Sequence, residues 1–214
     1  MLSRVFAALL VLLVAPLVSA QGMLEKYQAG VHYFPITPAQ PTASGDKVEV
    51  VEVFSYGCIH CANFEPMVKA WLAKKPAGAA FSYLPATFRQ DFAMLARMFY
   101  AAEQLGIREK THEPLFNAIF EERRPFHTMD DFVAFYAQTG GVPADKFKAA
   151  TTSFEVETKL TRATNLIQAY GVDGTPSVIV AGKYRVTGES AGGYPNVFDV
   201  VDFLVAKELA AKKS

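Results

Sequence analysis

Cysteine is scarce in this sequence. Its 214 residues include only two cysteines, Cys58 and Cys61, with Ile59 and His60 between them. An exported scaffold held together by disulfides carries several cysteine pairs. A bond between these two cysteines would close so short a loop that it would remove little entropy from the unfolded chain. The scarcity disfavours a structural disulfide framework, and the pair needs a chemical explanation.

An excess of charge of either sign is also missing, because 21 Lys and Arg residues stand against 21 Asp and Glu residues. A nucleic-acid-binding protein usually shows a basic stripe, and a polybasic segment marks contact with a membrane surface. Neither pattern occurs here, so we expect no nucleic-acid partner. Hydrophobic residues make up 51% of the chain, enough for a large buried core. The length fits one large domain, or one domain that carries an inserted second.

The longest apolar run lies near the start of the chain, from Val5 to Val18, and Pro16 interrupts it. A membrane-spanning helix needs about 20 mostly apolar residues, so this run is short for a retained anchor. Arg4 precedes the run, and Val18-Ser19-Ala20 places small or compact side chains where a signal peptidase cleaves. We predict a cleaved signal peptide over residues 1–20, and therefore export from the reducing cytosol. A retained membrane anchor is the alternative.

The order of predicted elements indicates an α/β fold interrupted by helices. In chain order we expect an extended arm (21–47), a strand (48–54), a helix from Cys58, a strand (80–88), a helical block (89–150), a long helix (153–170), a β-hairpin (177–187) and an amphipathic helix (195–212). The first strand is rich in valine on both faces, which predicts a central, parallel strand. We expect one α/β domain made of residues 21–88 and 153–214, with an all-helical insertion over 89–152.

The first predicted strand leads through Ser55-Tyr56-Gly57 to Cys58, which places this cysteine at the N-terminus of a helix. Unpaired backbone N–H groups and the positive end of the helix dipole favour a thiolate at that position. The thiolate is the nucleophile and also the better leaving group. We therefore assign Cys58 as the exposed, reactive sulfur and Cys61, one turn further along, as the buried resolving sulfur.

His60 stands between the two cysteines and favours the thiolate further if it is protonated. Stabilising the thiolate favours the reduced form and makes the disulfide a stronger oxidant, so the motif predicts that the pair donates disulfides. A solvated histidine with no redox role is the alternative. A zinc site would need two further ligands, and His32, His112 and His127 lie singly without ligand spacing. We expect no metal.

Thr175-Pro176 stands at the start of the predicted hairpin. Proline is tolerated at the first residue of a strand, and an X-Pro bond can be cis. Together with a distant Cys-x-x-Cys in an α/β chain, this dipeptide indicates a substrate-binding position, at which the Thr175 backbone pairs with an extended substrate segment. An ordinary loop proline is the alternative.

Two glutamates complete the candidate site. Glu52 lies in the middle of the apolar strand, where a carboxylate is costly unless it is paired or protonated. A buried carboxyl beneath the disulfide would relay the proton that Cys61 gains or loses; a polar gap or a lysine partner is the alternative. Glu65, in the first helix, is a candidate for tuning the charge near Cys58, with a plain surface position as the alternative.

The stretch from Glu52 to Cys61, the following Phe64-Glu65, Gly174-Thr175-Pro176 and the helical insertion together resemble the DsbA thiol:disulfide interchange proteins. The resemblance covers essentially all of the chain beyond the predicted signal peptide, and its Cys-x-His-Cys core is specific. It implies a thioredoxin fold with an inserted helical domain, a periplasmic location and oxidation of cysteines in newly exported proteins. It also implies reoxidation by a DsbB-like quinone reductase of the inner membrane. A DsbA is itself the usual example of this oxidising polarity.

The resemblance also implies a role for individual residues. Cys58 matches the nucleophilic cysteine, Cys61 the buried cysteine, His60 the histidine that stabilises the thiolate, Pro176 the cis proline and Glu52 the buried acid.

Two positions depart from the commonest family pattern. Ile59 stands where proline is most frequent, and the residues between the cysteines tune the redox poise. Thr175 stands where the best-known oxidases carry valine, and threonine there also occurs in disulfide isomerases. Both departures bear on the strength of oxidation rather than on the type of reaction.

We therefore expect a monomeric enzyme with no cofactor beyond its own Cys58–Cys61 disulfide. Its substrates would be unfolded exported proteins, held in a groove beside Pro176 that apolar residues of the insertion partly line. A reductase or isomerase that uses the same dithiol is the alternative, although an isomerase of the DsbC kind would normally bring a dimerisation domain larger than residues 21–47. A chaperone-like binder with an incidental disulfide is a third hypothesis.

Overall fold

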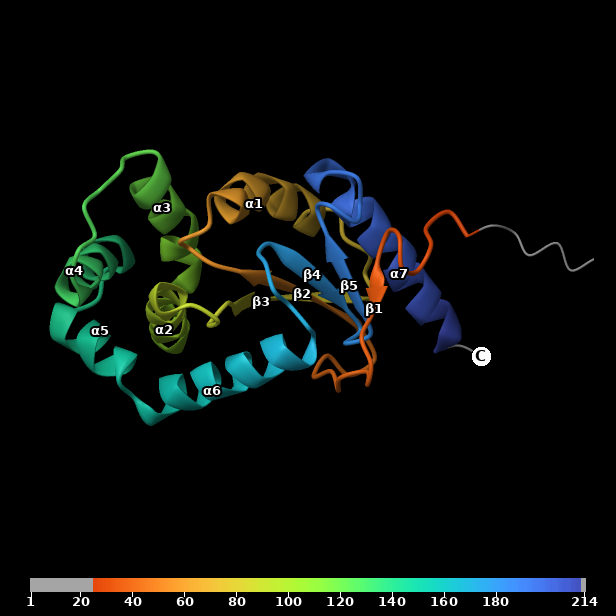
Figure 1. The fold of residues 1–214 in the computed structure, drawn as a ribbon. Coiled ribbons are helices and arrows are strands. Elements are labelled where there is room, and N and C mark those ends of the chain that lie inside the picture. Colours follow the sequence, from red (N-terminus) through yellow and green to blue (C-terminus); the bar gives the residue numbers. More distant parts are fainter. Residues whose placement is uncertain (1–24, 213–214) are drawn as a thin grey trace, which may run out of the picture.

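The computed structural model describes residues 25–212, which form a five-stranded sheet surrounded by helices (Figure 1). The predicted signal peptide lies outside these residues. The elements are β1 (Phe34–Pro35), β2 (Val48–Phe54), α1 (Ile59–Leu72), β3 (Ala79–Pro85), α2 (Gln90–Gln104), α3 (Arg108–Phe120), α4 (Met129–Gly140), α5 (Ala144–Thr151), α6 (Phe154–Ala169), β4 (Ser177–Val180), β5 (Tyr184–Thr187), a 3-10 turn (Tyr194–Asn196) and α7 (Val197–Ala211). Between residues 25 and 212, no helix combines the length and the apolar character needed to cross a membrane.

Strand β2 is an inner strand of the sheet, whose order is β1-β5-β4-β2-β3. It pairs parallel with β3 and antiparallel with β4. The predicted parallel strand is therefore parallel on one side only, because the β4–β5 hairpin returns along its other side. Apart from Glu49, all residues of β2 are buried, which is the reason why both faces of this strand are rich in valine.

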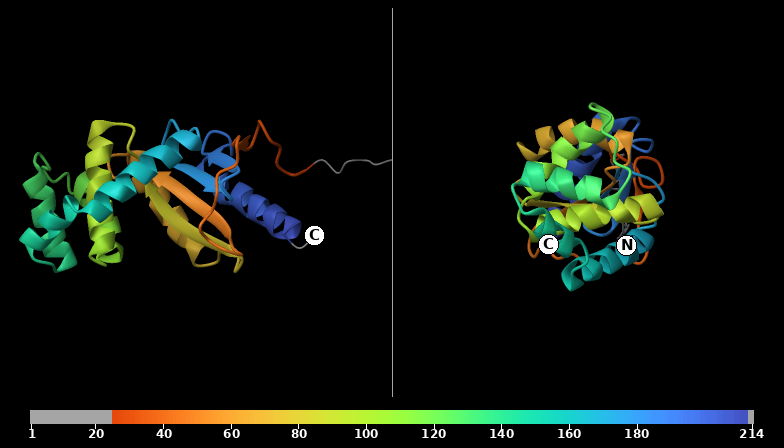
Figure 2. Two further views of the ribbon diagram at one scale, coloured as in Figure 1. Left: turned by 90° about the horizontal axis from the view of Figure 1, so that it is seen from below. Right: turned by 90° about the vertical axis from the view of Figure 1, so that its left-hand side faces the viewer.

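The two faces of β2 pack against different helices, because successive side chains in a strand point to opposite sides. Val48 and Val50 lie in one hydrophobic cluster with residues of α1 and α7. Val51 and Val53 lie in a second cluster with residues of α2 and α6. Figures 1 and 2 show α1 and α7 on one side of the sheet and α6 running along the other. Glu52 shares the orientation of Val48 and Val50, so its side chain points toward α1.

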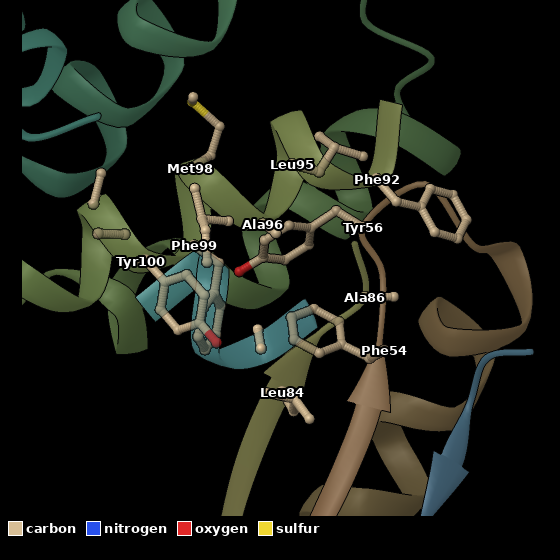
Figure 3. Packing of buried hydrophobic residues seen from close by; sticks show 14 of the residues in the cluster. Phe54, Tyr56, Leu84, Ala86, Phe92, Leu95, Ala96, Met98, Phe99 and Tyr100 are labelled. Atoms are coloured by element: carbon tan, nitrogen blue, oxygen red, sulfur yellow. The ribbon is translucent and has the colours of Figure 1, made fainter. Parts of the chain in front are cut away.

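Helices α2 to α6 lie between β3 and β4 in the chain, so the expected helical interruption of the sheet is present. Their buried side chains join those of β2 in one hydrophobic cluster. Figure 3 shows Phe54 and Tyr56, at the end of β2, beside Leu95 and Phe99 of α2. The ring centroids of Phe54 and Phe99 are 5.4 Å apart. The helices therefore pack directly against the end of the strand that leads to the cysteines.

Two observed boundaries differ from the expected ones for local reasons. Strand β3 ends at Pro85 rather than at residue 88, because Pro85 lies opposite Phe54, where the partner strand β2 also ends. The last helix begins at Val197, and the residues before it form the short 3-10 turn Tyr194–Asn196. This turn lies near the candidate site, as described below.

Candidate active site

Cys58 is the N-cap residue of α1 and has an extended backbone, with φ −111° and ψ 111°. Its N–H donates to the Ser55 carbonyl oxygen at 3.1 Å, and the Gly57 N–H donates to Ser55 Oγ at 3.1 Å. Gly57 fits this tight turn because a β-carbon at its position would lie 3.0 Å from Cε1 of Phe92. The predicted strand, turn and helix N-terminus around Cys58 are therefore present in the structure.

The surroundings of Cys58 favour its ionised form. A hydrogen bond from the Cys61 side chain is the largest effect that lowers the pKa of Cys58, which falls to about 5. Hydrogen bonds from the Thr175 side chain and from the backbone N–H groups of Cys61 and His60 lower this pKa further. Partial burial raises it but is outweighed. The unpaired N–H groups at the start of α1 thus stabilise negative charge on this sulfur.

Cys61 has the opposite environment. Its side chain is 1% exposed, and burial raises the pKa of Cys61 well above the usual thiol range. The hydrogen bond to Cys58 and the charge of Glu52 act in the same direction. Both cysteines are free thiols in this structure, which therefore represents the dithiol form. At neutral pH this form consists of a thiolate at Cys58 and a thiol at Cys61.

The loop before β4 brings Thr175 and Pro176 to the first cysteine. Cys58 Sγ lies 3.3 Å from the Thr175 carbonyl oxygen, although 117 positions separate the two residues in the chain. The Thr175–Pro176 peptide bond is cis. Ser177 holds the loop in place, because its Oγ donates to the Gly174 carbonyl oxygen at 2.8 Å and its backbone lies opposite that of Val53 in β2.

Glu52 lies in β2 beneath helix α1. It is 1% exposed, and within residues 25–212 its Oε2 has no hydrogen-bond partner. Burial, the nearby Glu65 and the charge of Cys58 raise the pKa of Glu52 well above the usual carboxyl range. Glu52 is therefore a neutral acid at neutral pH, since a buried and unpaired carboxylate is costly. In the described part of the chain no lysine forms an ion pair with it, so the alternative of a lysine partner is wrong.

Glu65 follows Cys61 by one helical turn and is only 5% exposed, so the alternative of a plain surface position is wrong. Tyr83 Oη donates to the Glu65 carboxylate and lies 3.1 Å from each oxygen. His112 Nε2 lies 3.4 Å from Glu65 Oε2, and His112 Nδ1 lies 2.8 Å from Tyr56 Oη. Glu65, Tyr83, His112 and Tyr56 therefore form one buried polar group next to the resolving cysteine.

His60 is exposed on the first turn of α1. Its backbone N–H contributes to the hydrogen bonding of Cys58, while its ring faces that of Tyr194, with 6.0 Å between the centroids and 30° between the planes. Tyr194 belongs to the 3-10 turn before α7 and also packs on Phe64, at 5.7 Å. Gly188 leaves room for the Tyr194 ring, because a β-carbon there would lie 2.6 Å from its Cε1.

Two exposed apolar side chains lie close to the Cys58 turn. Ile59, directly after Cys58, is 43% exposed, and so is Phe88. The Phe88 ring lies 5.6 Å from that of Phe92, which in turn contacts Gly57. The surface around the reactive sulfur is therefore partly apolar.

The sequence did not reveal the roles of Tyr83, His112 and Tyr194. His112 was considered only as a metal ligand, and among the described residues no three His, Cys, Asp or Glu side chains gather in a way that could hold a metal ion. Tyr83 lies directly opposite Glu52 in the parallel register of β2 and β3. Only that register, which depends on the tertiary fold, identifies the tyrosine as a neighbour of the acid.

Comparison with known proteins agrees with this geometry. A family model described as the DSBA-like thioredoxin domain matches residues 49–192. The chain belongs to this family. It is 36% identical to the thiol:disulfide interchange protein DsbA of Pseudomonas aeruginosa over 202 residues, which are 94% of this chain and 95% of the relative. It is 38% identical to the DsbA of Burkholderia cepacia over 177 residues, or 83% and 82% of the two chains.

Solved structures of the DsbA family have the same fold. The crystal structure of Pseudomonas aeruginosa DsbA has a TM-score of 0.83 and 36% identity, covering 89% of this chain and 99% of that one. The oxidoreductase DsbA of Xylella fastidiosa has a TM-score of 0.78 and 33% identity, covering 84% and 96%. This DsbA-family chain is therefore a thiol:disulfide oxidoreductase with a thioredoxin fold and a helical insertion, which confirms the predicted fold class and reaction type.

The two cysteines should titrate far apart in the reduced protein. The ultraviolet absorbance of the thiolate should fall as the pH decreases through about 5, because protons then bind Cys58. Cys58→Ser should remove this transition, whereas Cys61→Ala should keep it but move it to higher pH, since that variant loses the strongest hydrogen bond to the thiolate. A transition near the ordinary thiol range, about 8.5, in the unmodified protein would contradict the assignment.

Proposed function

We propose that this DsbA-family protein is a periplasmic oxidase that donates its Cys58–Cys61 disulfide to cysteines of newly exported proteins. The supporting observation is the opposite perturbation of the two thiols, with the pKa of Cys58 lowered to about 5 and the pKa of Cys61 raised by burial. A stabilised thiolate favours the reduced enzyme over its disulfide, so the disulfide is a ready electron acceptor.

The reaction would proceed in two thiol–disulfide exchanges. A substrate thiolate attacks Cys58 Sγ; a bond forms between these two sulfurs, and the Cys58–Cys61 bond breaks with Cys61 leaving. A second substrate thiolate then attacks the substrate sulfur of this mixed disulfide, and Cys58 leaves as a stable thiolate. The substrate has then lost two electrons, which reside on the two cysteines of the enzyme.

Glu52 would supply the proton that Cys61 needs when it leaves. A buried thiolate at Cys61 is costly, since burial raises the pKa of Cys61 well above the usual range. Glu52 is buried and neutral near it, and a negative charge on Glu52 raises the pKa of Cys61 further. We assign Glu52 as a general acid in the forward direction and as the base that deprotonates Cys61 during reoxidation.

The substrate would bind as an extended segment beside Thr175 and Pro176, with apolar contacts to Ile59 and Phe88. Exposed backbone next to a strand can pair with such a segment. The remaining partner in this proposal is a DsbB-like quinone reductase of the inner membrane that restores the disulfide. No further cofactor is needed, because both electrons pass between sulfur atoms.

The proposal includes the processing and organisation of the chain. A signal peptide over residues 1–20 would be removed on export, and the mature protein would act as a monomer. Residues 21–88 and 153–214 would make up the thioredoxin-like domain, and residues 89–152 the helical insertion. The cluster that joins α2 and α6 to β2 supports an insertion that shares the core of the site rather than folding apart from it.

Trapping the first exchange tests this function directly. Cys61→Ser, given a disulfide-bonded peptide, should accumulate a mixed disulfide at Cys58, because the resolving sulfur is missing. The unmodified oxidised protein should convert a dithiol peptide to its disulfide, and Cys58→Ser should have no activity in either assay. Full oxidation of the dithiol peptide by Cys58→Ser would instead favour a binder in which the disulfide is incidental.

The hydroxyl of Thr175 should strengthen the oxidant. Thr175→Val removes a hydrogen bond to the Cys58 thiolate while keeping the size of the side chain, so the pKa of Cys58 should rise from about 5. The equilibrium with glutathione should move toward the protein disulfide by roughly threefold to tenfold, the range for one hydrogen bond to a partly exposed charge. Thr164→Val is the matched control, because that hydroxyl bonds Thr87 and Leu160 away from the cysteines. An equal effect of both substitutions would contradict the role of Thr175.

A further inference from the structure

A carboxyl pair lies inside the protein next to Cys61. Glu52 and Glu65 come from β2 and α1, and both are nearly fully buried, at 1% and 5% exposure. Two carboxylates buried close together repel each other, and ionising both costs much free energy. The pair therefore retains one proton at neutral pH. The chemistry at Cys61 depends on which of the two carboxyls carries it.

The hydrogen-bond donors around the pair are distributed unequally. Glu65 lies 3.1 Å from the Tyr83 hydroxyl through each of its oxygens, and its Oε2 lies 3.4 Å from His112 Nε2. Glu52 Oε2 has no partner among residues 25–212. Donors stabilise a carboxylate, and their absence favours the neutral acid. The arrangement therefore puts the negative charge on Glu65 and the proton on Glu52.

The position of the hydrogen on His112 follows from its other contact. Its Nδ1 lies 2.8 Å from Tyr56 Oη. If Tyr56 donates to Nδ1, the neutral ring carries its hydrogen on Nε2, which then points at Glu65 Oε2. The other tautomer would aim a lone pair at a carboxylate. With Tyr56 as the donor in this contact, His112 is the tautomer that donates to Glu65 Oε2.

We propose that His112, from helix α3 of the insertion, is a positioning residue for disulfide exchange: it holds Glu65 as the carboxylate and thereby keeps the shared proton on Glu52, within reach of Cys61. The inference rests on the proposed role of Glu52 as the acid for Cys61. It gives the helical insertion a direct part in the chemistry, because α3 supplies a second donor to Glu65 beside the Tyr83 hydroxyl of β3.

Other charged groups face this cluster and must stay unchanged in a test. The Arg108 guanidinium, also from α3, lies 5.5 Å from the centroid of the Tyr83 ring and pairs with Glu109. Lys69 of α1 pairs with Glu113 of α3. The Cys58 thiolate and Cys61 face Glu52 from the start of α1. None of these groups replaces the donor that His112 presents to Glu65 Oε2.

The test locates the proton by carbon NMR of the Glu52 and Glu65 carboxyl groups in the reduced full-length protein at neutral pH. In the unmodified protein, Glu52 should resonate as an acid and Glu65 as a carboxylate. In His112→Phe the ratio of protonated Glu65 to protonated Glu52 should rise by about tenfold, which is the effect of losing one hydrogen bond to a charged group. His112→Gln, whose amide can still donate, should remain close to the unmodified protein. Thr111→Val is the matched control, since this buried neighbour bonds only backbone oxygens of its own helix and the preceding turn.

Kinetics then separate positioning from packing. Oxidation of a dithiol peptide should slow by about threefold to tenfold in His112→Phe, a fraction of what a general acid contributes. In a Glu52→Gln background the same substitution should cause no further loss, because His112 acts through Glu52.

Two results would overturn the inference. One is a Glu65 signal that is already that of an acid in the unmodified protein, which needs no variant to fold. The other is an equal loss of activity from His112→Phe with and without Glu52. Neither result depends on the direction of the physiological reaction. If the protein reduces its substrates instead of oxidising them, the proposed function is wrong, but the location of the proton can still be measured.

Discussion

Two sulfur atoms one helical turn apart hold protons with very different affinity, and most of the site follows from that difference. Cys58 caps α1, where backbone N–H groups, the Cys61 thiol and the Thr175 side chain all stabilise its charge. Cys61 is buried against the sheet and keeps its proton. These two environments stabilise the reduced form relative to the disulfide, because one sulfur becomes a stabilised thiolate and the other a buried neutral thiol.

The fold supplies these two environments through elements that are distant in the sequence. The end of β2 leads to Cys58 at the helix start, and the loop before β4 brings Thr175 to it. Cys61 lies in one hydrophobic cluster with Val51 and Val53 of β2. The helical insertion is fastened to the same place by Phe99, which packs on Phe54, and by His112, which contacts Tyr56 and Glu65. An insertion that reaches the buried side of the catalytic helix can influence the chemistry as well as the binding of substrate.

Local patterns were sufficient to predict the strand at 48–54, the helix after Cys58, the helical interruption and the family. They could assign the exposed and buried cysteines, because helix termini act on their immediate neighbours. They could not show that Glu65 is buried or that Tyr83 lies opposite Glu52, since both depend on how α1, α3 and β3 meet. His112 looked isolated for the same reason: its partners lie on the turn before α1 and on α1 itself. Strand β2 was predicted to be a parallel strand, but it is parallel only to β3, because the hairpin that follows α6 pairs antiparallel with its other side.

The equilibrium of the unmodified Cys58–Cys61 pair with a glutathione buffer tests the central claim most directly, because it measures how far the thiolate environment favours the reduced form. We expect the pair to be largely reduced in a buffer that leaves ordinary structural disulfides intact, and to be more oxidising than glutathione. A pair that remains a disulfide under those conditions, with a potential near that of thioredoxin at about −270 mV, would contradict the claim that this site is built to donate disulfides.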